Sequence, residues 1–337
     1  MGNKAFNVVT YSGTGSTQSI TGVGFQPDLI WIKRRNSTDW HQITDAVRGT
    51  NSQLFSNDTS AEDTATDKIT AFDSDGFTVS THTGVNASGG TYVAWCWKAG
   101  GTGVSNTNGS ITSTVSANAD AGFSIVSYTG NSTPNSTVGH GLSSAPEMII
   151  CKNRSAVKTW IIGSDEIAWT KTIQFTTAAA TTHDAFYNTA PSSSVFTIGD
   201  ASELNSSGNS IIAYCFHSVD GYSKVGSYTG NGSTDGTFVY TSFAPKYVMI
   251  KVTDLSAGES WHIFDKPRSV HNLTDDPLYA NNSSAEDTNA SGGGGRQMDL
   301  LSNGFKLRGN NDGVNKSGYT WIYIAFAESP FKHTNAR

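Results

Sequence analysis

The sequence predicts an all-β protein made of three tandem repeats of about 100 residues, each a β-sandwich or jelly-roll-like unit. Ser, Thr, Asn and Gly account for 143 of the 337 residues, whereas Leu occurs only 10 times. Helical proteins need Leu, Ala, Glu and Lys in quantity, so this composition disfavours an all-α fold. The 8 Trp, 12 Tyr and 16 Phe residues provide material for hydrophobic cores and argue against a disordered chain.

The repeats are recognised by landmarks that recur in the same order. Each repeat opens near a Tyr-Ser/Thr-Gly motif, continues to a proline that precedes an apolar run, and closes on an aromatic run. The motif occurs at Tyr11, Tyr128 and Tyr228; the prolines are Pro27, Pro146 and Pro245; and the closing runs are 92–97, 212–216 and 323–327. Chance similarity is a poor explanation for an order that is kept three times.

The strands follow from local patterns within each repeat. An apolar run such as Leu29 to Ile32, directly after a proline, is typical of a buried central strand, because proline cannot continue a ladder. The closing runs are rich in aromatic and β-branched residues, which suit a pleated surface. Asp75-Gly76 and Asn303-Gly304 indicate hairpin turns, since both turn residues need positive φ.

These landmarks place the units at 5–100, 122–220 and 221–333. The stretch 101–121 has the Gly/Ser/Thr-rich composition of a linker, although residues 111–115 alternate as in a short strand. No spacer separates the second unit from the third. We therefore expect those two units to pack closely and unit one to be hinged.

Charge and cysteine content exclude several classes of protein. The net charge is −6 without a basic run, so nothing indicates nucleic-acid binding. No apolar stretch approaches the roughly 20 residues of a membrane helix, and no membrane insertion is expected. Three cysteines do not make a disulfide framework.

Two Trp-His pairs are the candidate ligand-binding residues. Trp40-His41 and Trp261-His262 occupy matching places in the predicted repeats, and a Trp beside a His can stack on a sugar ring and bond its hydroxyls. The second unit has Trp160-Ile161 there, so Trp is the common element. This favours a core Trp with an outward His over a sugar site.

Adjacent acids form the other candidate chemistry. Glu62-Asp63 and Glu286-Asp287 lie in matching Ala-Glu-Asp-Thr stretches that the second unit lacks. Neighbouring residues do not set the separation that a glycosidase pair needs, so solvated loop acids are the favoured interpretation, with a weak metal site as an alternative. We predict no catalytic residue, no metal site and no cofactor.

Three stretches are similar to motifs of a known family: residues 221–232 around Tyr228, residues 300–308 around Asn303-Gly304, and the closing stretch 325–331. Through them the chain resembles a repeated β domain of virion proteins from marine tailed bacteriophages. The resemblance covers nearly the whole chain. Members of that group are mostly assigned as tail, fibre or other structural proteins, and the resemblance supplies no catalytic residues.

The resemblance implies a non-enzymatic virion protein, expected as a tail fibre or appendage for host attachment. A capsid or neck decoration protein is one alternative, and a glycan-binding or glycan-cleaving domain is another. The expected partners are other virion proteins and a host surface glycan or receptor. Assembly in the host cytoplasm fits the missing apolar signal core, and a homotrimer is expected by analogy with phage fibres.

Overall fold

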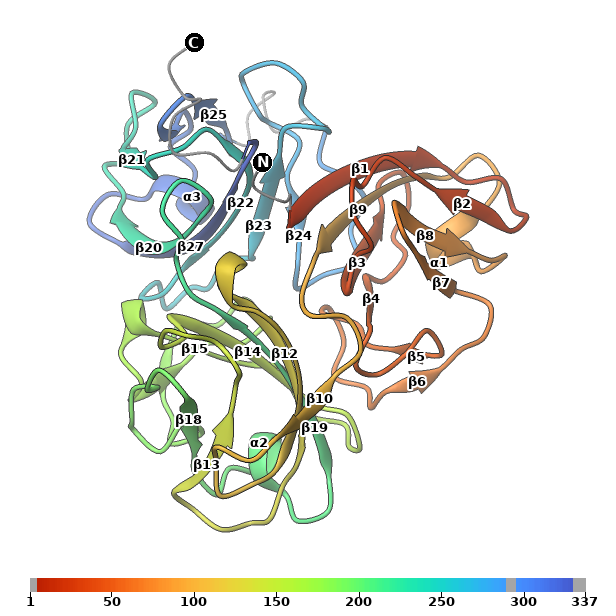
Figure 1. The fold of residues 1–337 in the computed structure, drawn as a ribbon. Coiled ribbons are helices and arrows are strands. Elements are labelled where there is room, and N and C mark those ends of the chain that lie inside the picture. Colours follow the sequence, from red (N-terminus) through yellow and green to blue (C-terminus); the bar gives the residue numbers. More distant parts are fainter. Residues whose placement is uncertain (1–4, 289–294, 330–337) are drawn as a thin grey trace.

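In the computed structural model, which describes residues 5–288 and 295–329, the chain forms three lobes around a common centre (Figure 1). Almost all regular structure is antiparallel β-sheet, so the predicted all-β class is confirmed. The helices in the described part of the chain are single short turns. None of these helices is long and apolar enough to cross a membrane.

The first lobe, within 5–100, pairs a four-stranded sheet (β1-β9-β3-β4) with a three-stranded sheet (β2-β8-β7). Its elements are β1 (Phe6–Ser12), β2 (Gln18–Ile20), β3 (Leu29–Arg34), β4 (Gln42–Asp45), β5 (Ser52–Gln53), β6 (Asp63–Thr64), β7 (Ile69–Asp73), β8 (Gly76–Val79), α1 (Thr83–Asn86) and β9 (Thr91–Trp97).

The second lobe contains a six-stranded sheet, β10-β11-β12-β19-β14-β15, and the pair β13-β18. Its elements are β10 (Val104–Asn106), β11 (Ser113–Asn118), η1 (Ala119–Ala121), β12 (Phe123–Thr129), β13 (Ser136–Gly139), β14 (Met148–Asn153), β15 (Ile161–Ser164), η2 (Asp165–Ile167), β16 (Lys171–Thr172), β17 (Thr181–Thr182), β18 (Val195–Ile198), α2 (Ser202–Asn205) and β19 (Ser210–Phe216).

The third lobe contains the sheets β20-β27-β22-β23-β24 and β21-β26-β25. Its elements are β20 (Ser223–Thr229), β21 (Phe238–Tyr240), β22 (Pro245–Val252), β23 (His262–Asp265), β24 (Leu278–Tyr279), β25 (Met298–Leu301), β26 (Gly304–Leu307), α3 (Asp312–Asn315) and β27 (Thr320–Ala327).

The main sheets share one strand order. β1-β9-β3-β4, β12-β19-β14-β15 and β20-β27-β22-β23 are paired in the same antiparallel sequence. Residues two positions after the landmark prolines hold equivalent register, since Leu29, Met148 and Tyr247 pair with Trp97, Phe216 and Phe326. That the three units superpose as whole repeats stays a prediction, which structural alignment tests.

The stretch 101–121 is not an extended linker. β10 and β11 add two strands to the edge of the second main sheet, where Val115 pairs with both Val104 and Val126. The alternation at residues 111–115 was therefore the informative local signal, and the Gly/Ser/Thr-rich composition was misleading. Glycine and serine here serve turns and sheet edges.

Each main sheet is buried on both faces, which explains the continuous apolar runs. In β9, Trp95 and Trp97 face the centre, whereas Ala94 and Cys96 face the core inside lobe one. The same alternation divides β19 and β27 between the central core and the cores of their own lobes. A strand with two buried faces reads as apolar throughout rather than as alternating.

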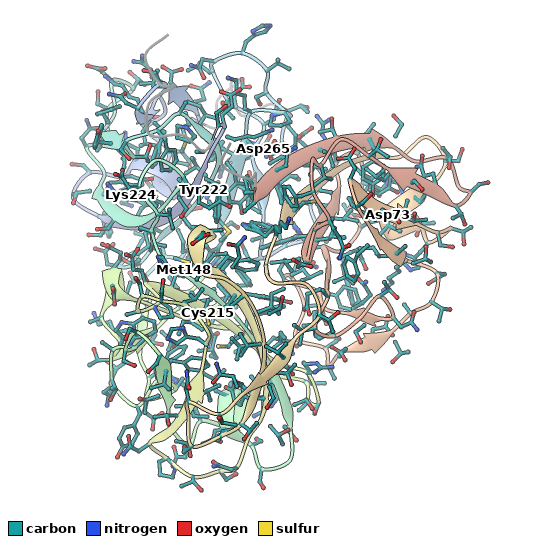
Figure 2. All side chains as sticks on the ribbon, in the orientation of Figure 1. Asp73, Met148, Cys215, Tyr222, Lys224 and Asp265 are labelled. Carbon is teal, nitrogen blue, oxygen red and sulfur yellow. The ribbon has the colours of Figure 1, made fainter. Side chains whose placement is uncertain are left out.

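The central core holds the lobes together. Figure 2 shows side chains filling the space between the lobes, among them the labelled Met148 and Tyr222. Phe6 stacks on Phe326 at 4.6 Å between ring centroids, which joins the first lobe to the last. The aromatic packing leaves a cavity of only about 20 Å³. Unit one is thus packed into the body, contrary to the expected hinge.

The repeated Tyr-Ser/Thr-Gly motif fastens each short helix to its main sheet. The tyrosine hydroxyls donate to the helix carbonyls at Tyr11–Val85 (2.7 Å), Tyr128–Leu204 (2.9 Å) and Tyr228–Val314 (2.7 Å). The glycine two residues later allows close approach of the chain after the helix. A Cβ atom at Gly130 would lie 2.4 Å from the Ser206 carbonyl oxygen, so a larger residue is excluded there.

We predict that Tyr128→Phe and Tyr228→Phe each lower the free energy of unfolding by about 1–2 kcal/mol, because each leaves a buried carbonyl without its donor. Urea denaturation followed by tryptophan fluorescence measures this loss. Tyr187→Phe is the matched control, since Tyr187 is exposed. Equal stability of Tyr128→Phe and the unmodified protein would contradict the role given to the motif.

Candidate functional site

The candidate site, which we call the junction pocket, lies where loops of all three lobes meet. It has a volume of about 440 Å³. Its walls come from the segments after β5, after β16 and after β24, and from the residues just before β15 and β23. The lining residues are Ser56, Asn57, Asp58, Thr59, Thr159, Trp160, Phe175, Thr176, Thr177, Ser260, Asn281 and Asn282.

A cyclic set of hydrogen bonds joins the lobes below this pocket. His41 Nε2 lies 2.9 Å from the Tyr279 carbonyl oxygen, so lobe one binds lobe three. The indole N–H groups make the matching contacts, from Trp160 to the Phe55 carbonyl (2.8 Å) and from Trp261 to the Gln174 carbonyl (2.7 Å). Each lobe therefore bonds a neighbour through the residue just before its fourth main strand.

These contacts correct the predicted equivalence of the tryptophans. In the strand register, Gln42, Ile161 and His262 face Ile32, Cys151 and Ile250, so His41 corresponds to Trp160 and Trp261. The strand register therefore shifts the first unit by one residue relative to the sequence alignment, which matched Trp40 with Trp160 and Trp261.

The burial of the Trp-His pairs follows from this shift. Trp40 is 44% exposed and rests its ring on Phe55, whereas His41, Trp261 and His262 are fully buried. The expectation of a core Trp beside an outward His is wrong for the first pair, and His262 is not outward either. None of the four residues lines the junction pocket.

His41 is held as a neutral imidazole. Its Nδ1 accepts from the Trp31 indole N–H at 2.8 Å, which leaves Nε2 to carry the proton donated to Tyr279. Burial, followed by the nearby charge of Lys33, lowers the His41 pKa well below its usual range. The ring thus replaces an indole as a donor between lobes.

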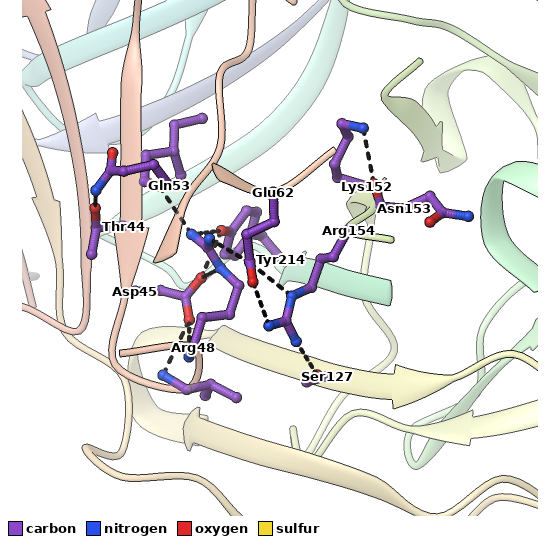
Figure 3. Close-up of polar contacts among 12 residues, drawn as sticks. Thr44, Asp45, Arg48, Gln53, Glu62, Ser127, Lys152, Asn153, Arg154 and Tyr214 are labelled. Atoms are coloured by element: carbon purple, nitrogen blue, oxygen red, sulfur yellow. Dashed lines mark hydrogen bonds and ion pairs between the residues drawn. The ribbon is translucent and has the colours of Figure 1, made fainter. Parts of the chain in front are cut away.

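An ion-pair network bridges lobes one and two (Figure 3). The buried Arg48 guanidinium contacts Asp45 at 2.5 Å and Glu62 at 3.0 Å. Glu62 also takes two hydrogen bonds from Arg154 of lobe two, at 2.7 and 2.8 Å. Burial raises the Glu62 pKa, but the hydrogen bonds and charges of Arg154 and Arg48 outweigh it, and the net pKa is lowered. Tyr214 of lobe two adds a hydrogen bond to Asp45 at 2.8 Å.

The same network recurs between lobes three and one. Arg268 contacts Asp265 at 2.6 Å and Glu286 at 2.8 Å, and Glu286 pairs with Arg35 at 2.7 Å. Trp95 of lobe one donates to Asp265 at 2.9 Å, in the place that Tyr214 takes at the other junction.

The junction of lobes two and three has the same backbone hydrogen bond as the other two junctions, but uncharged residues stand at its glutamate and arginine positions. The backbone N–H groups of Glu62 and Glu286 donate to the carbonyls of Arg154 and Arg35, at 2.8 and 2.7 Å. Ala180 N–H donates to the Thr253 carbonyl at 2.7 Å in the corresponding contact. Glutamate and arginine are thus both replaced, by alanine and threonine.

The sequence favoured solvated loop acids at all four positions, and the structure shows that this prediction is wrong for the two glutamates. The Glu62 and Glu286 side chains are only 16% and 7% exposed and are each bound by two arginines, whereas the Asp63 side chain is 51% exposed. The missed signal was an Asp-x-x-Arg spacing, Asp45 to Arg48 and Asp265 to Arg268. It occurs in the two units that carry the Ala-Glu-Asp-Thr stretch and is missing from the second unit together with it.

Buried lysines support the pocket loops from behind. Lys152 donates to the Thr59 carbonyl at 3.1 Å, and Lys251 donates to the Thr177 carbonyl at 2.9 Å. Lys33 holds the corresponding position in β3 and bonds the Ser37 carbonyl at 2.9 Å. Burial lowers the pKa of each of these lysines to about 8.

The loops at the pocket rim are held in turns by hydrogen bonds between their own side chains and backbone N–H groups two residues later. Asp58 Oδ1 accepts from the Ser60 N–H at 2.7 Å, and Asn282 Oδ1 accepts from the Ser284 N–H at 2.9 Å. In the second lobe Thr176 accepts from the Ala178 N–H at 3.2 Å. Such local turns fix short polar loops. Within residues 5–288 and 295–329, no group of three or more His, Cys, Asp and Glu side chains is placed to hold a metal ion.

Comparison with known proteins identifies the family. A family model described as a domain of unknown function, DUF7483, matches residues 2–330, and the chain therefore belongs to this family. No curated protein and no solved structure matches the chain.

We predict that Glu62→Gln lowers the free energy of unfolding by about 2–4 kcal/mol, because it leaves the buried Arg48 and the half-buried Arg154 without their shared carboxylate. Asp63→Asn is the matched control and should cost no more than about 1 kcal/mol, as for an exposed ion pair. Chemical denaturation at pH 7 compares the two. Similar values for both variants would contradict the assigned network.

A second prediction concerns the loss of stability at acidic pH. Burial lowers the His262 pKa to about 3, so the unfolded chain takes up this proton first as pH falls below 6.5, and stability is lost in that direction. His262→Ile installs the residue found at the corresponding position 161. Between pH 7 and pH 5 the variant should lose about 2 kcal/mol less than the unmodified protein.

Urea denaturation at the two pH values measures the difference. His271→Asn is the control, because it removes an exposed imidazole. An unchanged pH dependence in His262→Ile would show that this histidine is not held neutral by burial.

Proposed function

We propose that the protein is a non-enzymatic structural protein of a tailed-bacteriophage particle, displayed on the virion surface as a tail fibre or appendage that contacts the host. The resemblance of residues 221–232, 300–308 and 325–331 to a repeated domain of phage virion proteins supports this proposal. Other virion proteins would anchor it, and a host surface glycan or receptor would be its external partner.

The observation that supports a non-enzymatic protein is that the loop glutamates form ion pairs between lobes. Glu62 and Glu286 are the acids with matched positions in two units, and each is bound by two guanidinium groups that link lobes. The hydrogen bonds and charges of Arg154 and Arg48 lower the pKa of the Glu62 carboxyl despite its burial, and both carboxylates accept hydrogen bonds from arginine. A carboxylate held in this way is a poor general acid, which weighs against the glycan-cleaving alternative for these residues.

A capsid or neck decoration protein is the second candidate. The observation that favours it is the closure of the lobes on one another, with Phe6 of the first against Phe326 of the last. A chain closed in this way is compact, whereas a fibre shaft is elongated.

The proposal includes a homotrimer. Because the three lobes of one chain close on one another, the oligomeric state needs to be measured. Three lobes of one chain already cover their inner faces with each other, as we would expect of a monomer. Light scattering distinguishes the two states, because a trimer has three times the 35.7 kDa mass of one chain.

Electron microscopy of purified virions labelled with antibody against this chain tests the proposal. Gold particles on the tail or its appendages are the expected result, and gold on the head or neck would assign the decoration role instead. Virions without label, from lysates that contain the protein, would overturn both. An antibody against an established capsid protein of the same particle provides the positive control.

A further inference from the structure

We propose that the junction pocket binds an uncharged saccharide. The inference rests on the proposed host contact and names its chemistry. The volume of about 440 Å³ lies within the range of about 300–1,000 Å³ that is usual for small-molecule sites. It is also a place where all three lobes contribute side chains, so the pocket exists only in the assembled body.

The lining offers hydrogen-bond donors and acceptors in mixture. Serine and threonine hydroxyls, asparagine amides and one carboxylate surround the pocket. Asp58 uses Oδ1 for its own loop, and in the described part of the chain neither its Oδ2 nor the exposed Thr177 hydroxyl has a bonding partner. Saccharide hydroxyls both donate and accept, which matches such a set.

The inner end of the pocket is aromatic. Trp160 and Phe175 line it and belong to the central core. Their ring centroids lie 5.7 Å apart, and the two rings pack edge to face. The Trp160 indole is fixed by its hydrogen bond to the Phe55 carbonyl. Trp160 and Phe175 are almost fully buried, at 1% and 5% exposed, so they give the pocket a small apolar floor and not an open ring face.

The charges at the pocket select against anionic sugars. Asp58 is the charged residue of the lining, which contains no lysine, arginine or histidine. The lysines behind the wall direct their ammonium groups at backbone carbonyls, Lys152 at Thr59 and Lys251 at Thr177. Lys152 already offsets part of the Asp58 charge from behind the wall, and a uronic or sialic acid would bring a second carboxylate with no further cation in the lining.

The pocket is organised before any ligand arrives. Asn57 Oδ1 accepts from the His41 backbone N–H at 2.8 Å, and Asn281 Oδ1 accepts from the Trp261 N–H at 2.7 Å. These bonds tie two of the loops to the strands beneath them. Loops that are already ordered lose less entropy when a ligand binds.

The test uses the full chain on an array printed with neutral and acidic bacterial surface polysaccharides, followed by calorimetric titration with the best neutral oligosaccharide. Thr177→Val removes one hydroxyl and Asp58→Asn removes the charge but keeps the turn. Each should weaken binding about three- to tenfold. Thr177→Trp fills the mouth and should abolish binding. Thr107→Val and Asp67→Asn are matched exposed controls outside the pocket and should bind as the unmodified protein does.

Thermal unfolding of every variant checks that a loss of binding is not a loss of fold. Absence of binding to all neutral saccharides, binding to acidic ones alone, or undiminished binding by Thr177→Trp would overturn the inference. Virion labelling decides the proposed function separately. Labelled virions with no saccharide binding would refute only the pocket, whereas saccharide binding by a protein that no virion carries would refute only the location.

Discussion

The whole structure depends on the requirement that each main sheet be covered on both faces. The small sheet of each lobe covers one face, and only the other two lobes are available to cover the second. Trp97 and Phe216 end two of the equivalent central strands, Phe326 is the last but one residue of the third, and the three rings meet in the shared core. A single lobe would expose an apolar face of the kind that soluble monomers rarely show. The lobes are therefore parts of one folding body rather than independent domains.

Polar contacts then define how the lobes are joined, and they do so unequally. Both junctions of lobe one carry an Asp-Arg-Glu-Arg network, built on Glu62 and on Glu286. The junction of lobes two and three retains the backbone bond from Ala180 to Thr253 and lacks the charges. Breaking a buried ion pair is costly, whereas replacing all its members by uncharged residues often is not. The joint loss of glutamate and arginine in one junction follows that rule.

The sequence predicted the parts of the fold that repeat and depend on local pattern. The all-β class, the buried apolar runs and the recurring Tyr-Ser/Thr-Gly motif follow from composition, spacing and periodicity, whereas the strand order of the main sheets is known only from the structure. It misplaced Trp40, because alignment by residue type matched tryptophan with tryptophan, whereas the strand register matches His41 with Trp160 and Trp261. A neutral imidazole and an indole can both donate one N–H, and no sequence pattern reveals that exchange. Glu62 was misjudged because its partner Arg154 lies 92 residues away.

The contact between the first and last lobes has a consequence for biosynthesis. The inner face of β9 is finished at Trp97, but β27, whose Phe326 packs against it, is completed only at Ala327, which is 327 − 97 = 230 residues later. At about 5–20 residues per second, the ribosome leaves that tryptophan-rich face without its permanent cover for roughly 10–50 s. Nascent chains on one messenger therefore display the same apolar surface in close proximity, which favours association between them during that interval. Premature termination within the third unit makes the exposure permanent, so incomplete chains become substrates for proteolysis rather than partly working copies.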